Sequence, residues 1–133
     1  MEARCACGQL AVRLNGPTPS IAACHCVECR RRTGSAFGLG AYYRSDRVSV
    51  SGETKTYLRT AASGAELSFF FCPDCGSTLF WRSSLFPQRL AVAAGAIDDP
   101  AFPSPKNSLW EESKLAWVST DGMQFHYGRG LGD

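Results

Sequence analysis

The sequence predicts a single all-β domain of short antiparallel strands with one or two short helices. Three observations lead to this prediction. Most apolar segments alternate apolar and polar residues with a period of two, the pattern of half-buried strands. Turn-forming Gly, Pro and Asp residues separate these segments at short intervals. The seven cysteines stand in tight groups, as in the metal knuckles that join short strands.

The alternation places the strands in order along the chain. We expect them over residues 9–15, 36–43, 48–51, 54–59, 67–71, 78–81 and 90–97. Gly52-Glu53 predicts a hairpin turn between two of them, and Asp121-Gly122 predicts a closing hairpin that pairs residues 117–118 with 123–127.

Helical pattern is scarce. Residues 27–33 form the best candidate, because Gly34 follows them in the usual position for a helix C-terminus. Part of 108–114 is a weaker candidate, and the three prolines between 98 and 105 predict a loop. Residues 1–127 are expected to form one zinc-binding domain, and the Gly-rich residues 128–133 a flexible tail.

Composition narrows the function classes. The 133 residues carry a formal charge of +2, which is too small to predict a nucleic-acid partner, and Arg30–Arg32 is the only dense basic run. No apolar run approaches the roughly 20 residues of a membrane-spanning helix. The start of the chain has no apolar leader, and seven cysteines kept as thiolates favour a reducing cytoplasm.

The cysteines divide into four and three. In Cys72-Pro-Asp-Cys75-Gly, the spacing lets both sulfurs face one metal ion, and Cys5-Ala-Cys7-Gly supplies two more. The 65 residues between the pairs are no obstacle, since closure entropy grows only logarithmically with loop length. We expect a structural zinc here. The alternative is a redox-active dithiol at Cys72 and Cys75, which the lack of a surrounding βαβ pattern disfavours.

The second group, Cys24, Cys26 and Cys29, predicts a second zinc, and therefore two Zn²⁺ per chain. Three sulfurs leave a coordination position open, which makes these cysteines the candidate catalytic residues. The fourth ligand is water, a substrate thiol or His25, although His25 should point away from a metal that both its neighbours face.

Other polar residues near this group have two readings each. Glu28 is a candidate proton carrier or a solvated helix carboxylate. Arg30 and Arg31 are candidate contacts for an anionic substrate or part of a solvated basic face, and Arg32 is a candidate helix cap. His126, in the last expected strand, favours a plain surface role.

The combined order of motifs resembles the glutathione-dependent formaldehyde-activating enzyme (GFA) family, also called the centromere-protein-V/GFA domain. The resemblance rests on Cys-X-Cys, then Cys-His-Cys-X-X-Cys-Arg-X-X-Thr-Gly, then Phe-Cys-X-X-Cys-Gly-Ser, and it runs from Cys5 to about Trp117. It implies a β-tent fold, a structural zinc at Cys5, Cys7, Cys72 and Cys75, and a second zinc at Cys24, Cys26 and Cys29. Members often carry a histidine where this chain has Ser108.

The resemblance also implies a function. It points to a zinc-dependent carbon–sulfur lyase acting on a small thiol adduct such as S-(hydroxymethyl)glutathione, with glutathione or another small thiol as its partner. The alternative is a non-catalytic, zinc-stabilised β-tent module that binds a protein partner.

Overall fold

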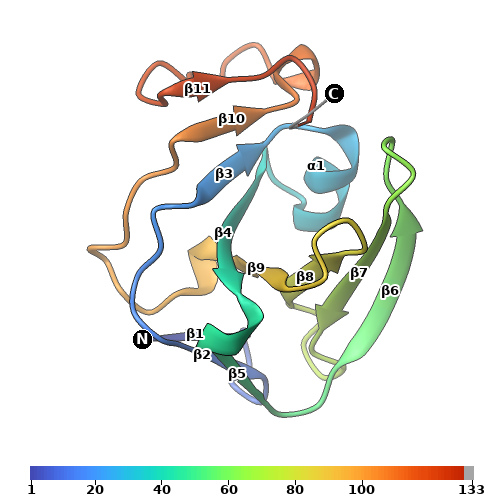
Figure 1. Ribbon diagram of the computed structural model, residues 1–133, viewed down its shortest axis with the longest axis vertical. Helices are drawn as coiled ribbons and strands as arrows, with labels where there is room; N and C mark the ends of the chain where they lie inside the picture. Colours follow the sequence, from blue (N-terminus) through green and yellow to red (C-terminus); the bar gives the residue numbers. More distant parts are fainter. Residues whose placement is uncertain (131–133) are drawn as a thin grey trace.

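The protein is a mainly β chain with one α-helix, seen in a computed structural model that describes residues 1–130 (Figure 1). Its strands are β1 (Glu2–Arg4), β2 (Ala11–Leu14), β3 (Ile21–Cys24), β4 (Gly38–Arg44), β5 (Val48–Ser51), β6 (Lys55–Thr60), β7 (Glu66–Phe71), β8 (Thr78–Ser83), β9 (Arg89–Ala93), β10 (Asn107–Leu109) and β11 (Phe125–His126). The helix is α1 (Val27–Thr33), and three 3₁₀ turns are η1 (Ser45–Arg47), η2 (Ala94–Ala96) and η3 (Glu111–Ser113). The prediction of an all-β fold with few helices is confirmed.

Two sheets carry these strands. The smaller has the order β1-β2-β5, and the larger has the order β11-β10-β3-β4-β9-β8-β7-β6. Most neighbours are antiparallel, as expected, but β10 pairs in parallel with both β3 and β11. Residues 110–124 join β10 to β11 and are long enough for this pairing, because parallel neighbours cannot be joined by a tight turn.

The core lies where the two sheets pack. Strand β2 contributes Val12 and Leu14, and β9 contributes Leu90 and Val92, to one apolar cluster. Cys5 and Cys72 belong to the same cluster. The core therefore reaches the first group of cysteines.

Helix α1 has the predicted bounds. The Cys26 side chain accepts a hydrogen bond from the backbone N–H of Cys29 at the N-terminus, and Gly34 ends the helix in the left-handed conformation with φ 63°. No helix residue is fully buried. The helix packs on β4 at Gly38, where an added Cβ would lie 3.2 Å from the Cys29 Cβ. Among residues 1–130, no helix is long and apolar enough to cross a membrane.

The predicted hairpin at Gly52-Glu53 is wrong. Strand β5 pairs with β2, and β6 pairs with β7, so residues 52–54 carry the chain from one sheet to the other. Gly52 has φ 100°, and the Gln9 side chain bonds Glu53 in both directions, through its Nε2 at 2.9 Å and its Oε1 at 2.7 Å. The glycine marks a turn, but the turn connects two sheets.

The structure also differs from what the sequence predicts for the C-terminal part of the chain. Residues 108–114 hold strand β10 and the short η3 instead of an α-helix. The hairpin around Asp121-Gly122 is wrong, because residues 117–118 form no strand and β11 pairs with β10. Within the expected tail, Gly128 and Arg129 accept backbone hydrogen bonds from Glu112 and Trp110. Residues 131–133 lie outside the described residues, and flexibility of the tail stays a prediction.

Gly52→Ala should destabilise the fold. An alanine there would need a φ that L-residues disfavour, and its Cβ would lie 2.2 Å from the Gln9 carbonyl oxygen. We expect a loss of at least about 1–2 kcal/mol in the free energy of unfolding, measured by urea denaturation. Gly95→Ala is the matched control, since nothing lies within 4 Å of its Cβ position. Equal stability of the two variants would contradict this role of Gly52 in the turn that carries the chain from one sheet to the other.

Candidate metal centres

Four sulfurs converge between two turns that are far apart in sequence. Cys5 and Cys7 come from the β1–β2 turn, and Cys72 and Cys75 from the β7–β8 turn; their Sγ atoms all lie within 4.8 Å of one another. The Cys5–Cys7 and Cys7–Cys72 Sγ distances are both 3.7 Å. Four thiolates around one zinc at about 2.3 Å would place neighbouring sulfurs about 3.8 Å apart. All seven cysteines are free of disulfides, so the group fits a tetrahedral Zn²⁺.

The surroundings of this first cluster suit thiolates. The Leu10 amide donates to Cys5 Sγ at 3.2 Å, and the Gln9 amide side chain donates to Cys72 Sγ at 3.1 Å. A hydrogen bond between Ser77 Oγ and Cys75 Sγ, 3.3 Å apart, is the main cause that lowers the pKa of Cys75 to about 5. Such N–H and O–H donors stabilise the deprotonated sulfurs that a metal requires.

The second cluster stands at the junction of β3 and α1. Cys24 ends β3, Cys26 caps the helix and Cys29 lies one turn later, so their three Sγ atoms lie within 4.8 Å of one another. Hydrogen bonds with Cys24 and Cys29 lower the pKa of Cys26 to about 2. Within residues 1–130, no fourth Cys, His, Asp or Glu ligand atom belongs to this group. It is therefore a three-sulfur site that fits a metal ion with an open position.

His25 lies between two of these cysteines in the sequence, but its side chain points away from their sulfurs. Its ring is fully buried, its Nε2 lies 3.1 Å from Ser108 Oγ, and it packs on Phe37 with a ring-centroid distance of 5.4 Å. Ser108 is also fully buried. The extended backbone around residue 25 turns alternate side chains to opposite sides, as the sequence predicted. His25 Nδ1 has no hydrogen-bond partner among the described residues.

The three arginines of α1 have different surroundings. Arg31 is exposed and Arg30 is half-buried, while Arg32 turns inward, with its guanidinium 4.4 Å from the centroid of the Trp81 ring. Glu28 is exposed. Arg59, from β6, reaches the same region and lies 5.3 Å from the Phe69 ring centroid. Sequence reasoning missed Arg59 and Trp81, because only the strand register brings them to the helix.

A groove lies between the C-terminal end of α1 and the turn that carries Cys75 of the first cluster. The groove, of about 470 Å³, borders Arg32, Phe37 and the turn that holds Cys75, Gly76, Ser77 and Thr78. Tyr42 points to the same face as Gly38, the register partner of Cys24. Burial, followed by the charges of Cys24 and Cys29, raises the pKa of Tyr42 to about 12, which keeps its hydroxyl protonated at neutral pH.

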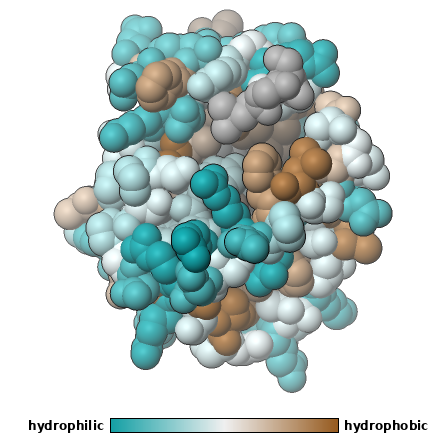
Figure 2. All heavy atoms as spheres, in the orientation of Figure 1, coloured by the Kyte–Doolittle hydropathy of each residue, from teal (hydrophilic) through white to brown (hydrophobic). Residues whose placement is uncertain are grey.

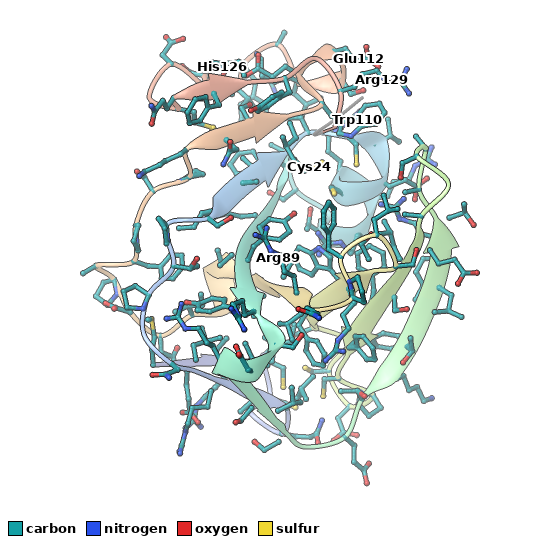
Figure 3. The ribbon with its side chains drawn as sticks, viewed as in Figure 1. Cys24, Arg89, Trp110, Glu112, His126 and Arg129 are labelled. Carbon is teal, nitrogen blue, oxygen red and sulfur yellow. The ribbon has the colours of Figure 1, made fainter. Side chains whose placement is uncertain are left out.

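Trp110 lies beside the end of β3 that carries Cys24. It directly follows Leu109, the register partner of Cys24, and has φ 58°, which is rare for a bulky residue (Figure 3). The Arg129 guanidinium lies 4.7 Å from its ring centroid, and the Trp110 amide donates to the Arg129 carbonyl at 3.0 Å. The C-terminal segment thus holds Trp110 in this conformation.

His126 has a partner that the sequence did not predict. Its Nδ1 lies 2.7 Å from Glu111 Oε1, and Thr120 Oγ1 donates to the same oxygen at 2.8 Å. Burial opposes ionisation of Glu111, but hydrogen bonds from His126, Ser108 and Thr120 outweigh it and lower its pKa to about 2. The hydrogen bond with Glu111 raises the pKa of His126. This pair fastens η3 to β11.

The fold and the two clusters together define a mainly β protein with one site of four sulfurs and one site of three sulfurs, each of which could hold a metal ion. The sequence profile of the glutathione-dependent formaldehyde-activating enzyme family matches residues 1–113. The chain belongs to this family.

Two relatives extend the comparison. A Penicillium rubens protein named "Putative glutathione-dependent formaldehyde-activating enzyme" is 30% identical over 82 residues, which are 62% of this chain and 42% of that protein. The match thus spans less than half the length of that relative. A crystal structure of a Rhodobacter sphaeroides protein superposes with a TM-score of 0.57, covering 96% of this chain and 99% of the other at 19% identity. That likeness shows the fold.

Cys72→Ser should release the metal of the first cluster and unfold much of the chain. Cys72 is buried in the core, and a structural metal supplies folding free energy directly. We expect a loss of more than about 3 kcal/mol in unfolding free energy, and of one zinc by elemental analysis. Cys26→Ser removes one sulfur from the other cluster and should keep the fold. Equal stability of the two variants would refute the structural role.

The His126–Glu111 pair should stabilise the protein most between about pH 4.5 and 6.5. The raised pKa of His126 contributes fully below its ordinary 6.5 and is lost as the pH rises through the folded value. The lowered pKa of Glu111 contributes fully above its ordinary 4.5 and is lost as the pH falls towards about 2. His126→Gln should therefore lower the melting temperature more at about pH 6 than at about pH 9. Gln124→Ala is the neutral control, and a pH-independent effect of His126→Gln would contradict the pairing.

Proposed function

We propose that the chain is a zinc-dependent carbon–sulfur lyase acting on a small thiol adduct of the S-(hydroxymethyl)glutathione type. The observation that supports this most directly is the three-sulfur cluster, which has no fourth ligand group among residues 1–130. A metal held this way keeps a position for an exchangeable molecule. Family membership supports the reaction class.

The reaction breaks the bond between sulfur and the hydroxymethyl carbon. The adduct gives formaldehyde and a thiol, the hydroxyl proton leaves, and the sulfur takes up a proton; the reverse direction condenses the same two molecules. A bound zinc would supply a Lewis acid for the sulfur or the hydroxyl oxygen. Cys24, Cys26 and Cys29 would hold that ion, whereas Cys5, Cys7, Cys72 and Cys75 would hold the structural one.

Residues around the cluster would bind the rest of the substrate. Arg32 and Thr33 connect the helix that carries Cys29 to a groove of about 470 Å³, which would take the organic part of a thiol such as glutathione. Arg30 and Arg31 stay candidates for outer contacts with an anionic substrate, since both stand on the helix that carries Cys26 and Cys29.

Calorimetry with glutathione on the zinc-loaded protein tests the proposal. We expect the wild type to bind glutathione and to turn over its formaldehyde adduct, and Cys26→Ser to lose both. Glu28→Gln is the control on the same helix, because Glu28 is exposed and lies outside the sulfur cluster. Its binding should stay within about twofold, as expected for a surface substitution away from special features.

Two results would sink the enzyme proposal. One is glutathione binding that is absent, or that Cys26→Ser leaves unchanged. The other is two zincs per chain with no exchangeable light ligand in X-ray absorption spectra and no turnover, which would favour the non-catalytic binding module instead.

A further inference from the structure

A row of aromatic side chains crosses the face of the large sheet that α1 covers. Successive register partners are Tyr42 with Ala91, Ala91 with Trp81, Trp81 with Phe69, and Phe69 with Tyr57. Partners in register project to the same face of a sheet, so the four rings share one side. Ring centroids of Phe69 and Trp81 lie 6.0 Å apart, and those of Tyr57 and Phe69 lie 6.4 Å apart.

This row lies beside the second cluster. Gly38, Gly40 and Tyr42 alternate along β4 on that face, and Gly38 is the register partner of Cys24. Gly40 leaves the space that the indole of Trp81 occupies, because an added Cβ would lie 2.9 Å from that ring. An aromatic floor therefore extends from the three-sulfur site across the sheet.

Two guanidinium groups stack on this floor. Arg32, from α1, lies 5.3 Å from the Phe69 centroid and 4.4 Å from that of Trp81, and Arg59, from β6, also lies 5.3 Å from the Phe69 centroid. Neither side chain makes an ion pair or hydrogen bond with any residue in the described part of the chain. Both are half-buried, and Arg32 Nε is buried without a partner.

The formal charges around the second cluster favour binding of an anion. Three thiolates on one Zn²⁺ carry a formal charge of about −1, whereas the two guanidiniums carry two positive charges. Two cations over one ring repel each other unless an anion joins them. A guanidinium stacked on a ring still directs N–H groups outward in its own plane, and such groups match the two oxygens of a carboxylate.

We propose that Arg32 and Arg59 bind a carboxylate of the thiol substrate above Phe69, which makes the enzyme selective for carboxylate-bearing thiols. This inference rests on the proposed function, because the substrate sulfur must reach the second cluster. It adds what the sulfur site alone cannot give: a preference among thiols that have the same reacting group. Figure 2 shows one face of the molecule, on which hydrophobic residues form only small groups among hydrophilic ones.

The test compares two small thiols that differ only at the far end. 3-Mercaptopropionate carries a carboxylate, and 2-mercaptoethanol carries a neutral hydroxyl. Calorimetric titration of the zinc-loaded wild type should show tighter binding of 3-mercaptopropionate. Arg59→Gln and Arg32→Gln should each weaken that binding about tenfold or more, the loss expected for a charged hydrogen-bonded contact, and change 2-mercaptoethanol binding by less than about twofold.

Arg82→Gln is the matched control. It removes the same charge from the neighbour of Trp81, but Arg82 is exposed and points to the opposite face of β8. Its binding of both thiols should stay within about twofold. Zinc content and circular dichroism of each variant confirm that the site is loaded and folded, and Arg59→Gln lies on an edge strand where it leaves the core intact.

Four outcomes would overturn the inference. Equal weakening of both thiols would mean that the arginines only balance the charge of the sulfurs. Unchanged binding of 3-mercaptopropionate in both variants would mean that they are surface cations. If neither thiol binds the wild type, the proposed function fails together with the inference. Binding of 2-mercaptoethanol without preference for 3-mercaptopropionate overturns the inference alone.

Discussion

The convergence of four sulfurs at the first cluster is the constraint on which the rest of the structure depends. It joins the β1–β2 turn to the β7–β8 turn, and thereby the small sheet to the large one. Cys5 and Cys72 are also members of the apolar core. A domain of this size has a limited core, so one strong link between distant segments replaces a large amount of packing. Gln9 bonds both Cys72 and Glu53, and it thereby ties the first cluster to the turn in which the chain passes from the small sheet to the large one.

The second cluster depends on this frame in a different way. Helix α1 has seven residues, none of them fully buried, and a helix that short is not stable by itself. It is fixed by its caps, by the close approach to Gly38, and by Arg32 stacked on Trp81. The helix positions two of the three sulfurs, and a metal bound to them would in turn hold the helix on β3. Site and helix therefore stabilise each other.

Sequence reasoning succeeded where the signal is local. Cysteine spacing defines both sulfur groups, period-two alternation finds most strands, and Gly34 marks the end of α1. It failed where two segments of similar pattern compete for a partner. Gly52 and Gly122 mark turns correctly, yet the strands beside them pair elsewhere, because pairing is decided by burial across the whole sheet.

The candidate substrate contacts show the same limit. Arg30–Arg32 is visible in the sequence as a basic run, but only the fold distinguishes Arg32, which turns onto the aromatic row, from the exposed Arg31. Arg59 carries no local signal at all. It reaches the site because β6 pairs with β7 in the register that places Tyr57 opposite Phe69. Long-range register, which single-sequence patterns do not encode, thus creates the charged side of the site.

The direction of His25 decides what the second cluster can do. His25 carries the only imidazole next to these cysteines in sequence, and its use as a ligand would close the site. Here the ring is buried on the other side of β3, with Nε2 at 3.1 Å from Ser108 and the ring against Phe37. Turning it towards the sulfurs would remove a buried hydrogen bond and leave a cavity, two costs of the kind that destabilise folded proteins most. Because Ser108 fixes His25 in this position, the three sulfurs have no fourth Cys, His, Asp or Glu ligand among residues 1–130, and this leaves the open position that the proposed carbon–sulfur chemistry requires.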